Sequence, residues 1–475
     1  MNGIKLGRNM LMLVFVVTAC SKTDTGIGKD KEIVLPSDGK GYSEILGRPS
    51  NSTVTMSILF DQPSEVYWEY GTTSGTYNLK TATGLTIKDT PLEYDFTNLA
   101  PNTKYYYRTC SRLSGETASF LAGPEHTFQT QRAPGSTFSF TIESDEHLYD
   151  KKGVLSIYQI CLNNQALDSP DFMFSLGDTF GDDHQATSIT SAQLDALHKY
   201  YRPLLGKICS SVPFLFCLGN HEGENDYYMG LTPPNNLAIN GTIWRKFYYP
   251  NPFPNGFYSG NTDNESWGIL MPENYYAFNW GDALFVVLDV YRYQNKTNPK
   301  PDGWDWSLGQ TQYNWLKSTL EASKSKYKFV FAHHVRGEGR GGINLAKYFE
   351  WGGFEQNGVT NNFSVKRPGW AKPIHQLFVD NKVNIFFQGH DHVFAHEVMD
   401  GVTYQELPMP SDSTYQIGKL ANGDAYTSDV VAGAGHLRVN VSVSGVKVDF
   451  VQAWLPRDEN GTQKNGQVAF SYLIK

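Results

Sequence analysis

Five short polar motifs carry the residue types that bind hard metal ions and transfer protons. The motifs are Asp145-Glu146-His147, Gly177-Asp178, Gly219-Asn220-His221-Glu222, His333-His334 and Gly389-His390-Asp391-His392. Two divalent cations held about 3.5–4 Å apart need carboxylate, amide and imidazole donors from several directions, and one carboxylate that can bridge them. Any one motif alone is typical of an ordinary turn, but the ordered set predicts a site for a pair of metal ions.

The motifs follow apolar runs that have the length and composition of buried β-strands. These runs occupy residues 138–142, 172–176, 212–218, 327–331 and 383–387, and a sixth covers 283–288. Helical patterns lie between several of them, at 155–166, 191–205, 311–323 and 372–381. The alternation predicts an α/β layered domain over residues 136–475, with a hairpin at 437–451 completing its sheet. Because ligands of open α/β sheets bind outside the carboxyl ends of the strands, the motifs should meet at one rim.

A shorter all-β pattern precedes this domain and should form a separate unit over residues 42–133. Val54, Met56 and Ile58 alternate with polar residues, an aromatic run follows at 66–70, and 71–75 is a glycine-containing turn. Short strands at regular spacing are typical of a β-sandwich. The stretch 99–107, in which a turn precedes three tyrosines, resembles the end of a fibronectin type III-like module. We expect a structural or docking role for this unit.

The first residues have the pattern of an export signal. Lys5 and Arg8 precede a short apolar run, and small residues lead up to Cys20. The run is far shorter than the ~20 residues of a membrane-spanning helix. Its end resembles a bacterial lipoprotein signal, which implies that residues 1–19 are removed and that lipid on Cys20 anchors the protein in the cell envelope, periplasmic or at the cell surface. An ordinary signal peptide with an incidental cysteine is the alternative. Residues 20–41 have the polar composition of a flexible tether.

The overall composition excludes some classes of partner. With 40% hydrophobic and 19% charged residues the chain is an ordered globular protein. Its formal net charge of −8 gives no electrostatic basis for binding long nucleic acid, so a phosphate-binding site would need local cations. Cys110, Cys161, Cys209 and Cys217 show no CxxC spacing. This argues against a zinc–thiolate site and leaves disulfide pairing, such as Cys209 with Cys217, open.

The ordered motifs resemble those of the calcineurin-like metallophosphoesterase superfamily. The β-rich unit in front, and the segment 275–278 leading into the strand at 285–289, are most similar to the purple acid phosphatase branch. The resemblance spans nearly all of residues 42–450. It implies a fibronectin type III-like domain followed by a four-layer αββα catalytic domain, and hydrolysis of a small-molecule phosphate ester at a binuclear metal centre.

The resemblance also implies a role for each motif residue. One metal ion would be held by Asp145, His147, Asp178 and His392, and the second by Asp178, Asn220, His333 and His390, with Asp178 as the bridge. His221 would protonate the leaving oxygen or stabilise the transferring phosphoryl group. Glu222 would orient His221 or form a structural salt bridge. Position relative to the strand end favours His333 over His334 as the ligand.

One motif departs from the purple acid phosphatases. Their second motif, GDxxY, carries a tyrosine that binds ferric iron, whereas this chain has Gly181 at that position. His147 can supply a neutral donor instead. The expected cofactors are two divalent or trivalent ions, Fe, Mn or Zn, and the change disfavours a mixed-valence ferric site. Water bound to two such ions would have its pKa brought toward ~7, so the expected nucleophile is a metal-bound hydroxide.

Further residues are candidates for contact with the substrate. Arg336 and Arg340, in a glycine-rich loop after His333, could clamp phosphate or a second anionic group, with a solvated loop surface as the alternative. His184 and Glu222 are additional candidates. The leading interpretation is a cell-envelope phosphomonoesterase of the acid phosphatase type. The alternatives are a phosphodiesterase acting on nucleotides or lipid head groups, and a catalytically silent binding lipoprotein.

Overall fold

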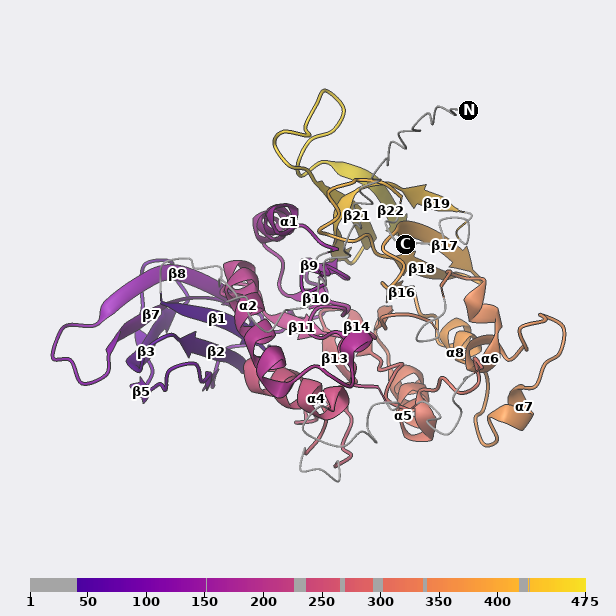
Figure 1. The fold of residues 1–475 in the computed structure, drawn as a ribbon, viewed down its shortest axis with the longest axis horizontal. Helices are drawn as coiled ribbons and strands as arrows, with labels where there is room; N and C mark the ends of the chain where they lie inside the picture. Colours follow the sequence, from indigo (N-terminus) through magenta and orange to yellow (C-terminus); the bar gives the residue numbers. More distant parts are fainter. Residues whose placement is uncertain are drawn as a thin grey trace, which may run out of the picture.

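The computed structural model describes residues 41–150, 152–225, 236–264, 270–293, 302–335, 340–417, 426 and 428–475. The predicted export signal, Cys20, the tether up to residue 40 and Arg336 lie outside these ranges. Within them, no helix is both long and apolar enough to span a bilayer. The described chain forms an N-terminal β-domain and a larger layered domain, which lie next to each other along the long axis of the molecule (Figure 1).

The N-terminal β-domain consists of two sheets packed face to face. One has the order β1-β2-β6 (Tyr42–Gly47, Val54–Phe60, Leu92–Phe96), and the other has the order β4-β3-β7-β8 (Leu79–Lys80, Ser64–Gly71, Lys104–Leu113, Leu121–Gln129), with β5 (Gly84–Leu85) paired to β3. Trp68, Phe96 and Tyr107 fill the space between the sheets. The hydroxyl of Tyr105 accepts a hydrogen bond of 2.8 Å from the backbone N–H of Ala100, which fixes the turn before β7. The predicted β-sandwich is confirmed.

The larger domain is built on two mixed sheets. The first has the order β11-β10-β9-β20-β21-β22 (Phe214–Phe216, Met173–Ser175, Phe138–Glu143, Ala434–Ser442, Gly445–Ala453, Val468–Ile474). Its strands β9, β10 and β11 are parallel, and the predicted hairpin β20–β21 pairs antiparallel to β9. The second has the order β12-β13-β14-β15-β16-β18-β17-β19 (Ser259–Gly260, Tyr276–Trp280, Ala283–Val287, Tyr327–Phe331, Ile385–Gln388, Val402–Glu406, Phe394–Met399, Asp429–Val431). In this sheet β14, β15, β16 and β18 are parallel.

Aromatic side chains fill the space between these two sheets. Phe174 of β10 stacks on Phe331 of β15 with ring centroids 4.3 Å apart, and Phe331 stacks in turn on Phe387 of β16 at 5.1 Å. Strand β14 is apolar at every position, as burial from both sides requires. The core between the sheets therefore holds the parallel strands of both in a fixed relation.

Helices cover the outer face of each sheet and complete the predicted four layers. α1 (Leu155–Asp168) and α2 (Ser191–Cys209) pack on the six-stranded sheet, and α5 (Gly309–Ala322) and α8 (Ile374–Asp380) pack on the eight-stranded sheet. α4 (Leu237–Tyr248) packs along α2 and was not expected from the sequence pattern. Short helical turns lie in the loops: η1 (Asp183–Gln185), η2 (Leu345–Lys347), α6 (Phe349–Gly352) and α7 (Phe363–Lys366). The αββα architecture is confirmed.

The two domains share a buried interface centred on α2. The guanidinium of Arg202 in α2 is fully buried and donates to the backbone carbonyl oxygens of Tyr248 and of Ser57, the latter at 2.8 Å. Tyr107 from β7 donates its hydroxyl proton to the carbonyl oxygen of Ser210 at 2.6 Å. These bonds hold the N-terminal β-domain against the layered domain.

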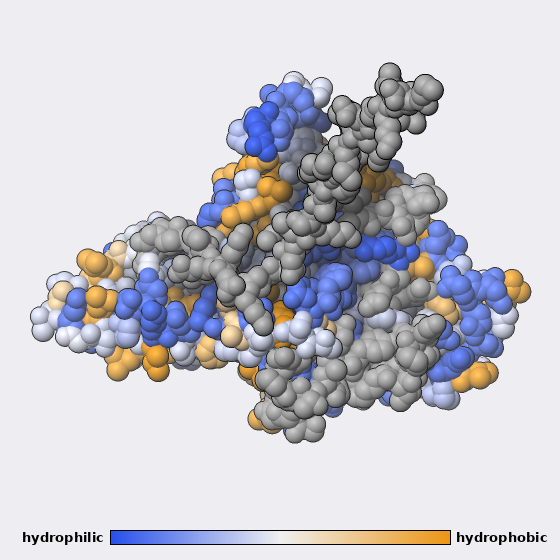
Figure 2. Space-filling model, viewed as in Figure 1, coloured by the Kyte–Doolittle hydropathy of each residue, from blue (hydrophilic) through white to orange (hydrophobic). Residues whose placement is uncertain are grey.

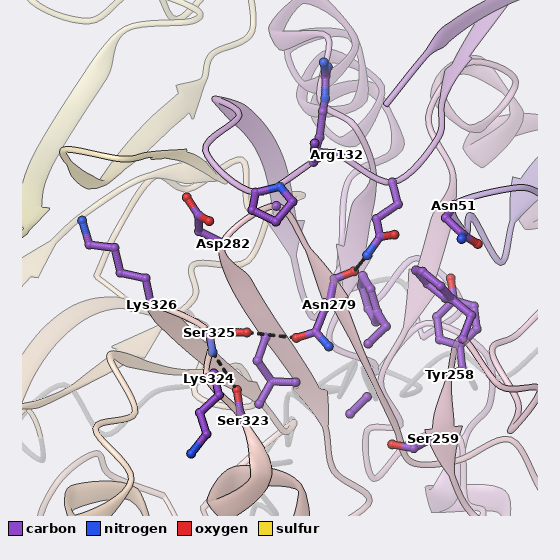
Figure 3. Close-up of a pocket in the computed structure, with 18 of the residues that line it drawn as sticks. Asn51, Arg132, Tyr258, Ser259, Asn279, Asp282, Ser323, Lys324, Ser325 and Lys326 are labelled. Carbon is purple, nitrogen blue, oxygen red and sulfur yellow. Dashed lines mark hydrogen bonds between the residues drawn. The ribbon is translucent and has the colours of Figure 1, made fainter. Parts of the chain in front are cut away.

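A cavity of about 1100 Å³ lies where the N-terminal β-domain meets the amino ends of β14 and β15 (Figure 3). Asp282 and Lys326, which precede these strands, line one side of it, and Asn51 and Tyr258 lie on the other. The polar motifs follow the carboxyl ends of the same strands or of their neighbours. This cavity is therefore at the opposite end of the sheet from the motifs.

All four cysteines in the described ranges, Cys110, Cys161, Cys209 and Cys217, are buried and carry free thiols. The sulfur of Cys209 lies 3.5 Å from Sδ of Met173, and that of Cys217 lies 3.5 Å from the carbonyl oxygen of Leu288. The disulfide between Cys209 and Cys217, which the sequence left open, is not formed because their sulfurs face different neighbours.

Candidate metal centre

The predicted site residues in the described ranges meet at the carboxyl ends of the strands. β9 leads to Asp145 and His147, β10 to Asp178, β11 to Asn220 and His221, β15 to His333, and β16 to His390 and His392. All of these side chains are buried. Both sheets direct parallel strands toward this rim, so five loops that are distant in sequence contribute to one cluster.

Asp145, His147 and His392 form one group of donors. Nε2 of His147 lies 2.9 Å from Nε2 of His392. Oδ1 of Asp145 lies 3.3 Å from Nε2 of His392 and 3.7 Å from Nε2 of His147. Burial lowers the pKa of His392 to about 4, so its neutral ring can donate a lone pair to a cation. Two imidazole nitrogens and one carboxylate oxygen thus point into a common space.

Asp178, His333 and His390 form a second group beside the first. Oδ2 of Asp178 lies 3.3 Å from Nε2 of His333 and 3.7 Å from Nε2 of His147. Burial, together with the charge on His333, holds the pKa of His390 well below its usual value. The carboxylate of Asp178 thus lies within 3.7 Å of an imidazole nitrogen from each of the two groups.

Several buried atoms of the cluster lack a hydrogen-bond partner within the described part of the chain. They include Oδ1 of Asp145, Oδ1 of Asn220 and Nε2 of His333. Leaving buried polar atoms unpaired is costly, and a cation would satisfy each of them. Oxygen and imidazole donors in this proportion suit Mn, Fe or Zn. The donor set therefore fits metal ions.

The backbone that carries these donors adopts an uncommon conformation. Values of φ between +46° and +75° occur at Asp145, His147, Asp178, His390 and His392. Residues other than glycine adopt this region rarely, and such strain clusters at functional sites. Gly389 is required by close contact, because a Cβ there would come within 2.1 Å of Oγ of Ser144. Steric contact with Ser144 thus explains why position 389 is a glycine.

Hydrogen bonds on the far side of two imidazole rings direct their Nε2 atoms at the cluster. Nδ1 of His147 lies 3.0 Å from the hydroxyl of Tyr149 and 3.4 Å from Oδ2 of Asp150. Nδ1 of His333 donates to the carbonyl oxygen of Leu176 at 2.7 Å. Such outer partners fix the tautomer and orientation of a ligating histidine. The sequence reasoning missed Tyr149 and Asp150, although both lie within three residues of the first motif.

His221 lies beside His147 and Asp178, with which it forms a further group of possible donors, and it is held by a residue that the sequence reasoning also missed. Its Nε2 lies 3.7 Å from Oδ2 of Asp178, and its Nδ1 lies 2.9 Å from Oδ1 of Asp183. Burial alone would lower the pKa of His221, but Asp178 and Asp183 outweigh it and raise this pKa to about 9. The acidic pair Asp182-Asp183, soon after Asp178, was the available sequence signal.

Glu222 has a different place from the one expected for a substrate contact. Its buried carboxylate accepts four backbone N–H bonds, from Gly219 at 2.6 Å, Asp178 at 3.0 Å, Thr179 at 2.6 Å and Phe180 at 2.8 Å. These bonds join the loop after β10 to the loop after β11. Glu222 therefore stabilises the backbone conformation around Asp178. Its carboxylate is occupied by these bonds, which corrects the prediction that Glu222 contacts the substrate.

The other substrate-contact candidates in the described ranges lie at the rim. Nη1 of Arg340 donates to the carbonyl oxygen of His390 at 2.9 Å, which places the guanidinium beside the second group. The side chain of His184 is 65% exposed, and its ring centroid lies 5.0 Å from that of His221. Arg340 thus adjoins the cluster from one side and His184 from another.

Comparison with known proteins agrees with this architecture. Residues 139–394 match the model of the calcineurin-like phosphoesterase family. No curated protein matches the chain in sequence.

Two solved structures share the fold over most of the chain. The purple acid phosphatase PPD1 from yellow lupin (Lupinus luteus) seeds superposes with a TM-score of 0.60 and 17% identity, covering 91% of this chain and 73% of the phosphatase. PhoD superposes with a TM-score of 0.57 and 16% identity, covering 88% of each chain. At these identities the likeness concerns the fold.

Proposed function

Because the chain belongs to the calcineurin-like phosphoesterase family and is thus a metal-dependent phosphoester hydrolase, we propose that it is a phosphomonoesterase with a binuclear metal centre. The observation that carries the proposal is the position of Asp178. Its carboxylate lies within 3.7 Å of imidazole nitrogens from both donor groups, so one residue can serve two ions.

The proposed ligand sets follow the two groups. Asp145, His147, Asp178 and His392 would hold one ion, and Asp178, Asn220, His333 and His390 would hold the other. Asn220 is included because its unpaired Oδ1 is buried at the same rim. Fe, Mn and Zn all suit these donors. Since Gly181 replaces the tyrosine of the purple enzymes, we expect the concentrated protein to lack a purple absorption band.

His221 is the proposed general acid. When bound, the metal ions would act as Lewis acids toward phosphoryl oxygens and lower the pKa of water. Asp183 holds Nδ1 of His221, so Nε2 faces the cluster and can give its proton to the leaving alcohol oxygen. Tyr149 and Asp150 keep His147 directed at the cluster. Arg340 and His184 are positioned to contact the substrate at the rim.

The test compares a monoester with a diester. Purified protein is assayed with p-nitrophenyl phosphate and bis-p-nitrophenyl phosphate, with added Mn²⁺ or Zn²⁺ and after EDTA treatment, and its metal content is measured. We expect monoester hydrolysis that EDTA abolishes and metal restores, with an Asp178→Asn variant low in both metal and activity. Faster hydrolysis of the diester would favour the phosphodiesterase alternative. Inactivity on both esters at two metal ions per chain would favour a binding lipoprotein.

We also propose that the protein is lipid-anchored in the bacterial cell envelope. The support is the sequence ahead of Cys20, in which basic residues, a short apolar run and small residues precede the cysteine. A Cys20→Ser variant should leave the membrane fraction for the soluble fraction on cell fractionation. Equal membrane retention of the variant and the unaltered protein would contradict anchoring through this residue.

A further inference from the structure

Asp391, between the two histidines of the last motif, ties that motif to the loop that follows β15. Oδ2 of Asp391 accepts hydrogen bonds from the backbone N–H of Gly341 at 2.7 Å and from the hydroxyl of Tyr426 at 2.5 Å. Oδ1 pairs with Nη1 of Arg340 at 3.1 Å. The carboxylate is fully buried. Three partners thus fix its position, and it in turn fixes the position of Arg340.

Arg340 keeps one edge of its guanidinium available. Nη1 is engaged by Asp391 and by the carbonyl oxygen of His390, whereas Nε and Nη2 make no hydrogen bond to any residue in the described ranges. The side chain is 32% exposed, while His390 beside it is buried. The guanidinium therefore lies at the boundary between the cluster of donor side chains and solvent, and among the described residues nothing occupies its remaining N–H groups, which can meet an anion.

We propose that Arg340, positioned by Asp391, makes the site select phosphate monoester dianions over diester monoanions. This inference rests on the proposed function and names the residues that set its substrate class. A guanidinium held on one side can offer parallel N–H donors to phosphate oxygens from the other, which a lysine ammonium cannot reproduce. Arg340 is the group that would touch the substrate, and Asp391 is a positioning residue.

The number of free phosphoryl oxygens explains the selectivity. A monoester presents three terminal oxygens, so one remains available when the cluster engages the other two. In a diester that third oxygen carries a substituent and no charge. It offers Arg340 a weaker acceptor and competes with the guanidinium for space. A fixed arginine at the rim therefore favours the dianion through a charge-assisted hydrogen bond.

The test measures binding as well as turnover. Affinities of metal-loaded protein for inorganic phosphate and for dimethyl phosphate are measured by calorimetry at mildly alkaline pH. Values of kcat and KM are measured for p-nitrophenyl phosphate and bis-p-nitrophenyl phosphate. We expect Arg340→Ala to weaken phosphate binding and raise the monoester KM by about 10-fold or more, the size typical of a lost charged hydrogen bond. Dimethyl phosphate binding and the diester KM should change little. Arg340→Lys should recover only part of the loss.

Combining substitutions at Asp391 and Arg340 shows whether Asp391 acts by positioning Arg340 or whether its loss damages the whole motif. Asp391→Asn should raise the monoester KM in the same direction as Arg340→Ala, and should add little to it in the Arg340→Ala background. Metal content should remain normal in all variants. The exposed Arg457→Ala is the matched control and should change nothing.

Unchanged phosphate affinity and monoester KM in Arg340→Ala, with active unaltered protein, would overturn the inference and leave the proposed function standing. The inference would also be wrong if Asp391→Asn lowered kcat and metal content by the same factor in the unaltered protein and in Arg340→Ala. Asp391 would then act through the neighbouring ligands His390 and His392 and not through Arg340. Inactivity of the unaltered, fully metallated protein on both esters would overturn the proposed function, and phosphate affinity would still report on Arg340.

Discussion

Oδ1 of Asp183 lies 2.9 Å from Nδ1 of His221, and Oδ2 of the same carboxylate accepts a hydrogen bond of 3.2 Å from the amide of Asn220. One side chain thus orients two consecutive residues of one motif. It leaves Nε2 of His221 and Oδ1 of Asn220 facing the cluster of metal-binding side chains. Outer carboxylates with this role tune the groups they hold.

Replacing Asp183 with asparagine should impair catalysis more than metal binding. Asp183→Asn removes the charge that fixes His221, so we expect kcat for p-nitrophenyl phosphate to fall by about 10–100-fold. Metal content should stay near normal because the substitution leaves all of the proposed metal ligands in place. Asp182→Asn, at the neighbouring acid, is the control, and an equal loss of kcat there would contradict the orienting role of Asp183.

The two adjacent histidines after β15 should differ in their effect on metal binding. Nε2 of His333 lies 3.3 Å from Oδ2 of Asp178. His334 is buried with its ring centroid 5.0 Å from that of His390. We expect His333→Asn to lose metal on dialysis and His334→Asn to retain it, as measured by elemental analysis. The reverse pattern would show that the ligand choice is wrong.

Glu222→Gln should destabilise the protein. The substitution places an amide NH₂ among four backbone N–H donors that now meet a carboxylate. We expect the free energy of unfolding in urea to fall by about 2–3 kcal/mol, the size of a lost buried hydrogen bond to a charged group. The exposed Glu116→Gln is the matched control and should leave it unchanged. An unchanged free energy of unfolding in Glu222→Gln would show that these four hydrogen bonds do not stabilise the protein.

Gly389→Ala should disrupt the last motif. A Cβ at this position would come within 2.1 Å of Oγ of Ser144 and 2.5 Å of Oδ2 of Asp145, so the loop must shift. We expect weaker metal retention and a lower melting temperature than in the unaltered protein. Gly461→Ala has open space around its Cβ and serves as the control. Equal metal retention in the two variants would argue against the tight packing of this loop.

His198 in α2 should make stability depend on pH. Its buried ring packs against Phe180 and Tyr248, and neither ring nitrogen has a hydrogen-bond partner within the described ranges. Burial, together with the charges of Arg245 and Arg202, lowers the pKa of His198 to about 3. The unfolded chain binds the proton near its usual pKa of about 6.5, so the folded state loses stability as pH falls from there toward 3.

Substitution of His198 provides the measurement. The free energy of unfolding of metal-free protein is measured in urea at about pH 7 and at about pH 5. Between these pH values His198 alone can lower this free energy by up to ~1.4 kcal/mol per pH unit. We expect His198→Phe to lose less stability than the unaltered protein between the two conditions. Equal losses would assign the pH dependence to other groups.

The sequence by itself determined the elements and the residues that carry the chemistry. Apolar runs predicted the strands β9, β14 and β15 almost to their bounds, and periodicity predicted α1 and α5. These signals are local, since each depends on neighbours within a few residues. The helix α4 was not predicted because its Asn, Gly and Thr residues are weak helix formers. Its packing on α2 stabilises it. The order of the motifs was enough to identify the family.

Tertiary structure alone decided which side chains support that chemistry. The contacts of Glu222 with the loop after β10, of Asp183 with His221, and of Asp391 with Arg340 each join different loops. Those loops are neighbours because parallel strands in two facing sheets end at a common rim. Strand order and sheet packing arise from the whole chain at once, so no stretch of sequence near any one of these residues specifies its partner.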